Sequence, residues 1–199
     1  MAKRSKKIIR KSAWHEAGHA THCLATIDRT TLIEYGHPAF KGIWVSRDTD
    51  EESPVCANTY FNDREAERGA AGAVLSTGKQ IFCNDRTEIA NLMAGLAGER
   101  ILRGTKTAGR ATTYAFFSGC MNDFVAAEAV VKRHNNNPAA KFVWLSGRKT
   151  MDFGLQNAWE TLRRYHEVHR RIAEHLIQHG YMRYEEAKAL WERHWRECQ

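Results

Sequence analysis

Residues 13–20 of the chain read Ala-Trp-His-Glu-Ala-Gly-His-Ala and contain the pattern His-Glu-x-x-His. On an α-helix, side chains four positions apart lie on one face, so His15 and His19 would direct two imidazoles at one point. Zinc accepts such nitrogens at about 2.0–2.1 Å in roughly tetrahedral surroundings. Glu16, one position round the helix, can reach a metal-bound water as general base without binding the metal itself. The stretch therefore predicts a zinc site with a catalytic glutamate.

The same spacing also arises by chance, because the chain has ten histidines. His175 and His179 are again four positions apart, but no other feature of the sequence indicates a metal site there. His22, one turn beyond His19, could be a third ligand, a group behind the ligands or a surface residue, but it is poorly placed for an ion held between the first two histidines. Positions 22 and 25 are His and Ala, whereas the metzincin pattern needs Gly and His there, so that class of metalloprotease is excluded.

The composition limits the class of protein. With 199 residues, of which 43% are hydrophobic, we expect one globular domain over residues 1–199. No run of about 18 apolar residues occurs, so we expect no transmembrane helix, and the N-terminus lacks the apolar stretch of a signal peptide. The five cysteines form no Cys-x-x-Cys pair. This predicts reduced thiols in a cytoplasmic protein and argues against a zinc site built from cysteines.

The formal net charge is +7, and much of the positive charge lies in residues 1–11. Attraction to nucleic acid, phospholipid headgroups or an acidic protein is one interpretation of this basic N-terminal segment. A solvated helix end is the other, and we favour it because no interleaved aromatic side chains accompany the charge. Nucleic acid is therefore not an expected partner.

Apolar periodicity and capping signals predict a mainly α-helical fold with a small β-sheet or hairpin. Asp85 is the expected N-cap of one helix, and Gly18 inside the first helix would let another element approach closely. We expect helices over residues 5–28, 63–77, 85–103, 119–134, 139–146, 152–179 and 183–197, the last two within a C-terminal helical part over residues 150–199. We expect strands in residues 30–33, 42–46 and 59–61, and loops in residues 48–58 and 104–118.

Four segments, in order along the chain, share features with one family. Residues 14–20 read WHEAGHA, residues 37–47 begin with His-Pro, residues 92–104 read LMAGLAGERILRG and residues 118–124 read SGCMNDF. They resemble the aromatic-HEAGHA core, the following strand segment, the LAGRAAER-type helix and the TGASNDL segment of the peptidase domain of the FtsH-type ATP-dependent zinc metalloproteases. The first and last segments are specific, and the similar closing helices are less so. The resemblance covers nearly the whole chain and implies an FtsH-peptidase-like zincin helical domain.

The resemblance also implies a third zinc ligand. In the family the Asp of the last segment completes the zinc site, and the matching residue is Asp123. Three protein ligands plus water is also the open arrangement of catalytic zinc sites. Asp123 could instead cap or charge a helix start. Glu99 matches a family glutamate, and two roles stay open for it: orienting a ligand imidazole, or forming one half of a structural ion pair.

The chain departs from the family pattern in several respects. It contains no Gly-x-x-x-x-Gly-Lys-[Ser/Thr] motif and no membrane anchor, so we expect a peptidase domain that stands alone. Leu96 stands where an Arg is usual, and residues 105–117 look expanded. We expect the substrates to be peptides, disordered segments, or chains that a separate ATPase or other partner delivers. Because the family forms hexameric rings, we keep assembly into a homo-oligomeric ring as an alternative for this chain.

These features predict a cytoplasmic zinc metalloendopeptidase, in which His15, His19 and Asp123 hold Zn²⁺ and Glu16 is the general base for proteolysis. An extended substrate would add to an edge strand, for which residues 42–45 are the candidate. The alternative is a catalytically silent module of the same fold. Its basic N-terminal helix would contact nucleic acid or an acidic protein, or it would regulate full-length family members by assembling with them.

Overall fold

The computed structural model describes residues 5–26, 40–45, 72–75, 84–111, 121–138 and 147–197. These residues form a mainly helical fold with one small antiparallel sheet, as predicted. The helices are α1 (Lys6–Thr26), α3 (Asp85–Leu102), α5 (Met121–Asn135), α6 (Gly147–Arg164), α7 (His166–His179) and α8 (Tyr184–Glu197). The strands are β1 (Gly42–Val45), β2 (Gly72–Leu75) and β3 (Tyr181–Arg183). The strands predicted in 30–33 and 59–61, the helix in 139–146 and the loop in 48–58 lie outside the described residues.

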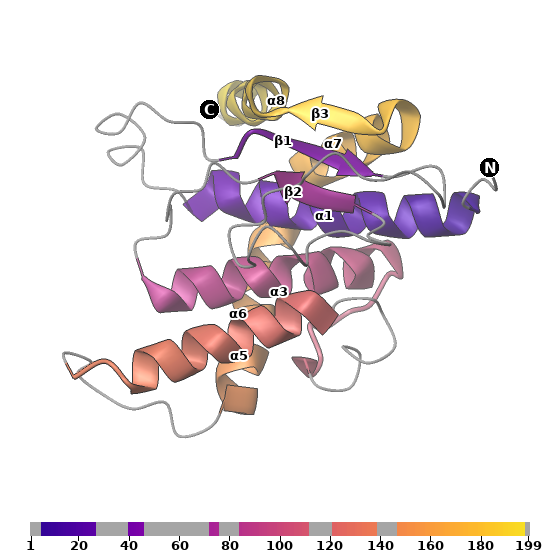
Figure 1. Ribbon diagram of the computed structural model, residues 1–199. Coiled ribbons are helices and arrows are strands. Elements are labelled where there is room, and N and C mark those ends of the chain that lie inside the picture. Colours follow the sequence, from indigo (N-terminus) through magenta and orange to yellow (C-terminus); the bar gives the residue numbers. More distant parts are fainter. Residues whose placement is uncertain are drawn as a thin grey trace.

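Two hydrophobic cores meet where α1 packs on α3 (Figure 1). In the first core, α1 packs with the sheet, α7 and α8, and Ile43, Ile172 and Leu176 are fully buried. The second core joins α3, α5 and α6 around Leu92 and Leu155. None of the described helices is long and apolar enough to cross a membrane.

The three strands are antiparallel in the order β2-β1-β3, so β1 is the central strand. Gly42 lies opposite Leu75 of β2 on one side and opposite Arg183 of β3 on the other. Because neighbouring strands occupy both edges of β1, a substrate cannot add to residues 42–45, and that prediction was wrong. The sequence pattern also missed the short strand β3.

β2 stands where the end of the predicted helix over residues 63–77 was expected. Residues 72–75 are extended and pair with residues 42–45 of β1. Gly and Val, at positions 72 and 74, are weak helix formers, and the backbone ladder with β1 holds the segment as a strand. The prediction was wrong for these four residues, and the remainder of that segment lies outside the described residues.

The start of α3 is displaced by one residue from the prediction. Asn84 is the N-cap, because its side-chain Oδ1 accepts the backbone N–H of Thr87 at 2.9 Å. Asp85 instead forms an ion pair with Arg133 of α5 at 2.7 Å. At the other end of α3, Gly104 has the left-handed φ of +71° that favours glycine, and the helix ends near it as predicted.

The single helix predicted over residues 152–179 is two helices, α6 and α7, separated at Tyr165, whose φ of −109° and ψ of 34° are not helical. Leu162, before the break, belongs to the core around α3, whereas Val168, after it, belongs to the core around α1. The break turns the chain from one core to the other, which the periodicity within each half does not reveal. Gly180, with a φ of 77°, ends α7 as predicted.

Candidate metal centre

The candidate site lies where α1 and α3 approach closely. Gly18 of α1 faces the carbonyl oxygen of Ala94, so a Cβ at Gly18 would collide with the backbone of α3. Gly98 of α3 in turn faces the carbonyl oxygen of Trp14, and a Cβ there would collide with the backbone of α1. These glycines bring the two helices together, in agreement with the close approach expected at Gly18.

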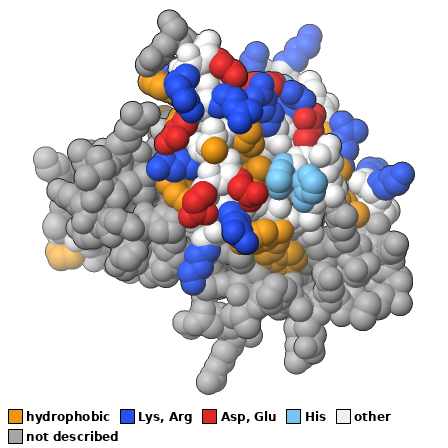
Figure 2. All heavy atoms as spheres, turned by 90° about the horizontal axis from the view of Figure 1, so that it is seen from above, with side chains coloured by type: hydrophobic (Ala, Val, Ile, Leu, Met, Phe, Trp, Pro, Cys, Tyr) orange, Lys and Arg blue, Asp and Glu red, His pale blue; other side chains and the backbone are white. Residues whose placement is uncertain are grey.

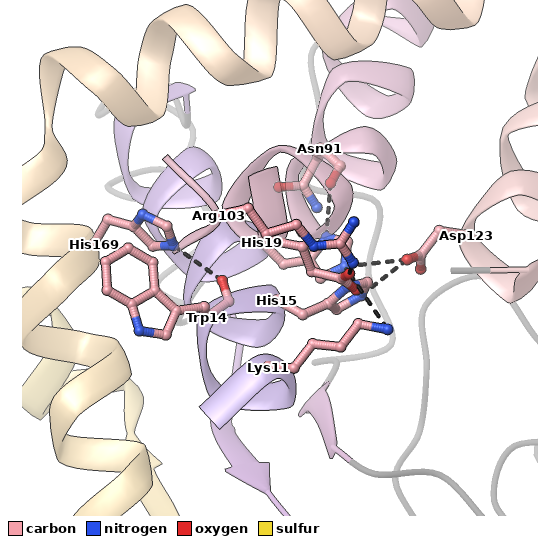
Figure 3. A network of polar contacts seen from close by, with 9 residues as sticks. Lys11, Trp14, His15, His19, Asn91, Arg103, Asp123 and His169 are labelled. Carbon is pink, nitrogen blue, oxygen red and sulfur yellow. Dashed lines mark hydrogen bonds and ion pairs between the residues drawn. The ribbon is translucent and has the colours of Figure 1, made fainter. Parts of the chain in front are cut away.

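The three side chains predicted as zinc ligands converge on one point (Figure 3). The Nε2 atoms of His15 and His19 are 3.1 Å apart, and Oδ2 of Asp123 lies 3.0 Å from the first and 3.5 Å from the second. Ligand atoms bonded to a tetrahedral zinc ion at about 2.0–2.1 Å would be about 3.3 Å apart, so both the donor set and its spacing fit this metal. Gly95 leaves room for the two rings, because a Cβ there would collide with both Nε2 atoms. No second group of this kind occurs in the part of the chain that the structure describes.

The hydrogen bond that Nδ1 of each ring makes determines whether the Nε2 atom of that ring carries a proton or a lone pair. Nδ1 of His19 lies 2.7 Å from the backbone carbonyl oxygen of Asn91, so this nitrogen must donate. Nδ1 of His15 lies 3.1 Å from a carboxylate oxygen of Glu99 and donates as well. In neutral rings, both Nε2 atoms then carry lone pairs that face each other and the carboxylate of Asp123. Three electron pairs this close require added protons or a cation between them, and zinc is a cation that prefers this donor set.

Asp123, the predicted third ligand, and Glu16, the predicted general base, lie in different surroundings. Asp123 extends from the first turn of α5. Burial opposes its ionisation, but His19 and His15, when their rings carry the added protons, outweigh burial and hold the pKa of Asp123 well below its usual range. Glu16 is buried and lies outside the group of converging ligand atoms. Burial raises the pKa of the Glu16 carboxyl, although the two neighbouring imidazoles act in the opposite direction.

Glu99 fills both of the roles left open for it. Its carboxylate is only 2% exposed, and it accepts the Nδ1–H of His15. It also pairs with Nζ of Lys11 at 3.4 Å and with Nη2 of Arg103 at 3.3 Å. A buried carboxylate without such partners would be costly. Glu99 therefore fixes the ring of His15 while cations from α1 and the end of α3 balance its charge.

The other histidines considered as ligands lie elsewhere. His22 is buried with Nε2 3.5 Å from Oδ1 of Asn157, and burial lowers the pKa of His22 to about 4. The rings of His175 and His179 are 4.5 Å apart at the surface end of α7, and Nε2 of His175 contacts the backbone oxygen of Tyr181 at 3.0 Å. Neither place holds three metal-ligating groups among the described residues.

Three contributors to the site were not assigned a role from the sequence. Asn91 acts through its backbone carbonyl, a group that every residue type has, so the residue type does not indicate this role. Gly95 acts by lacking a side chain, and its only signal was its place in the segment that resembles the family helix. His169 is fully buried and donates from Nε2 to the carbonyl oxygen of Trp14 at 3.0 Å, which secures the backbone just before His15.

No family model matches the chain, and no curated protein is significantly similar to it in sequence. The likeness to FtsH-type peptidases is therefore carried by the sequence motifs alone, and the site is described by the geometry of its own residues.

Proposed function

We propose that this protein is a zinc-dependent endopeptidase that resembles the peptidase domain of the FtsH-type metalloproteases. The observation that carries the proposal is the convergence of two imidazole lone pairs and a carboxylate oxygen from His15, His19 and Asp123. Three ligands of this kind leave the fourth position of a tetrahedral zinc ion open, as catalytic sites require. The buried Glu16 beside them is the residue type that peptide hydrolysis needs as a general base.

The chain's own residues would divide the reaction as follows. Bound zinc would lower the pKa of a water and polarise a peptide carbonyl. Glu16 takes a proton from the attacking water and passes it to the leaving amine. Glu99 and the carbonyl of Asn91 hold the two imidazoles in one orientation, so that both Nε2 atoms stay directed at the metal position.

The substrate class follows from the resemblance: peptides or unfolded polypeptides in the cytoplasm, delivered where necessary by a separate ATPase. A homo-oligomeric ring belongs to the same proposal. An extended substrate would pair with an outer strand of the sheet, because β1 is central. β2 is the better candidate, since it packs against α1, the helix that carries both histidines.

The test compares Glu16→Gln with the wild type for zinc content and for hydrolysis of casein. We expect about one zinc per chain in both proteins and a fall in hydrolysis of about 10²–10⁴-fold or more in the variant, because a general base contributes about that much. Glu174→Gln, an exposed change on α7, is the matched control and should cleave normally. Equal cleavage by Glu16→Gln would remove the assigned role, and zinc without cleavage in the wild type would favour the catalytically silent module.

A further inference from the structure

A pocket of about 590 Å³ opens where the end of α3, the last turn of α6 and the first turn of α7 meet. This volume lies within the range of about 300–1,000 Å³ that is typical of small-molecule sites. Gly104 has open space on the side where a Cβ would project. The described residues that line the pocket are Ile101, Gly104, Thr105, Lys106, Arg163 and His166.

The described lining carries three basic side chains and no carboxylate. Lys106, Arg163 and His166 come from three separate segments, so the fold brings them together rather than a local run of charge. None of the three forms an ion pair with a carboxylate of the described residues. By contrast, Arg170 on the same α7 is paired with Glu167 at 2.7 Å. Figure 2 likewise shows acidic and basic side chains interspersed on the face above α8 and β3.

Two of the three basic side chains lie against the rings of buried tryptophans. The guanidinium carbon of Arg163 is 4.8 Å from the ring centre of Trp159, and the ring of His166 is 6.2 Å from that of Trp14. Stacking restricts the guanidinium plane and leaves its N–H edges available to a ligand. Side chains that are already restrained lose less entropy when a ligand binds.

The basic start of the chain lies at the same end of the molecule. His19 contacts residue 91 and Lys11 contacts Glu99, so α1 and α3 are antiparallel, and the first turns of α1 lie beside the last turns of α3 (Figure 1). Besides Lys11, which pairs with Glu99, residues 6–10 contribute three further cations there. The positive potential around the pocket therefore extends beyond its lining and would attract an anion from solution.

We propose that this pocket binds a small phosphate ester. A phosphate group offers several strong acceptor oxygens, which suit the fork of Arg163, the ammonium of Lys106 and a ring N–H of His166 together. Ile101 offers apolar surface for the organic part of the ligand. The inference does not rest on the proposed peptidase activity, since it uses none of the zinc ligands.

The test is isothermal titration calorimetry with phenyl phosphate. We expect saturable binding at one site per chain in the wild type. Lys106→Ala and Arg163→Gln should each weaken it about tenfold or more, because hydrogen bonds to charged groups are among the strong ones. Lys132→Ala on α5 and Arg193→Gln on α8 remove exposed charges elsewhere and should leave the affinity unchanged. Melting temperatures of the four variants check that each one folds.

Several results would overturn the assignment. Absence of saturable binding in the wild type would remove the site, and equal weakening in pocket and control variants would move it elsewhere. Tighter binding of phenylacetate than of phenyl phosphate would show that the pocket prefers a carboxylate to a phosphate group. Binding of single-stranded DNA without binding of phenyl phosphate would make the basic end a nucleic-acid surface.

Discussion

Two helices of this protein carry a pair of histidines four positions apart, and only one pair forms a candidate metal site. The ring centres are 4.8 Å apart for His15 and His19 on α1 and 4.5 Å apart for His175 and His179 on α7. The spacing therefore places both pairs of imidazoles almost equally close. On α7, however, one ring contacts the backbone oxygen of Tyr181 through Nε2, the atom that would otherwise face a metal.

The difference comes from the helices that surround α1. α3 supplies an acceptor for each Nδ1, from Glu99 and from the carbonyl of Asn91, and α5 supplies the carboxylate of Asp123. These contacts force the lone pairs of both Nε2 atoms toward one point. The motif places two nitrogens on one face of a helix, but the packing of two further helices brings three donor atoms together there.

Removal of one ligand should have the largest effect. His19→Ala should lower zinc affinity by more than 100-fold, because even changes behind the ligands cost about 10–100-fold. His179→Ala on α7 should leave the affinity unchanged. Competition with a chromogenic chelator measures both, and equal zinc affinities for the two variants would abolish the distinction between the two pairs.

His169, a buried histidine that supports the backbone before His15 without joining the converging side chains, is a third histidine to compare. Burial lowers the pKa of His169 from its ordinary value of 6.5 to about 4. The unfolded chain therefore binds this proton more readily, and stability is lost as the pH falls from 6.5 toward 4, by about 3 kcal/mol in full. His169→Gln, which keeps a donor for the carbonyl of Trp14, should remove most of that loss. Urea unfolding at pH 7 and pH 4.5 measures it, with the more exposed His175→Gln as control; a pH dependence identical to the wild type would contradict the burial argument.

Gly95→Ala tests the space that α3 leaves for the two imidazoles. The added methyl would collide with both Nε2 atoms, so we expect a stability loss of about 1–3 kcal/mol together with loss of zinc. Gly104→Ala meets no neighbour and should cost about 1 kcal/mol through its positive φ alone while zinc stays bound. Thermal melts and zinc analysis separate the two variants. Full zinc binding by Gly95→Ala would show that the helices are not so closely packed.

Glu99→Gln should have the smallest effect. The side chain keeps its shape but loses the charge that holds His15, so zinc affinity should fall by about 10–100-fold. Glu174→Gln, which removes an exposed partner of Arg170, should not change it. An unchanged affinity in Glu99→Gln would reduce Glu99 to a structural ion pair with Lys11 and Arg103.

The sequence predicted those parts of the fold that are set by local pattern. The first helix, its pair of histidines and the ends at Gly104 and Gly180 follow from periodicity and from residue type. Asp123 became a candidate only through the resemblance, because spacing cannot select one carboxylate among 23. Apart from the N-cap of α3, which the local bond from Thr87 to Asn84 sets, the failures were decided by tertiary contacts.

These failures share a physical cause. Residues 72–75 became a strand because β1 lies beside them, and the chain breaks at Tyr165 because two cores have to be reached. The contributions of Asn91 and Gly95 to the site were equally invisible. One acts through its backbone and the other through an absent side chain, so neither residue type signals its role.

X-ray absorption at the zinc edge tests the central claim most directly. For the purified protein, and equally for the variant with both His175→Ala and His179→Ala, we predict about one zinc per chain. Its nearest neighbours should be nitrogen and oxygen only, at about 2.0–2.2 Å, with the scattering signature of two imidazoles. A zinc-free protein, or sulfur neighbours at about 2.3 Å, would contradict a metal centre built from His15, His19 and Asp123.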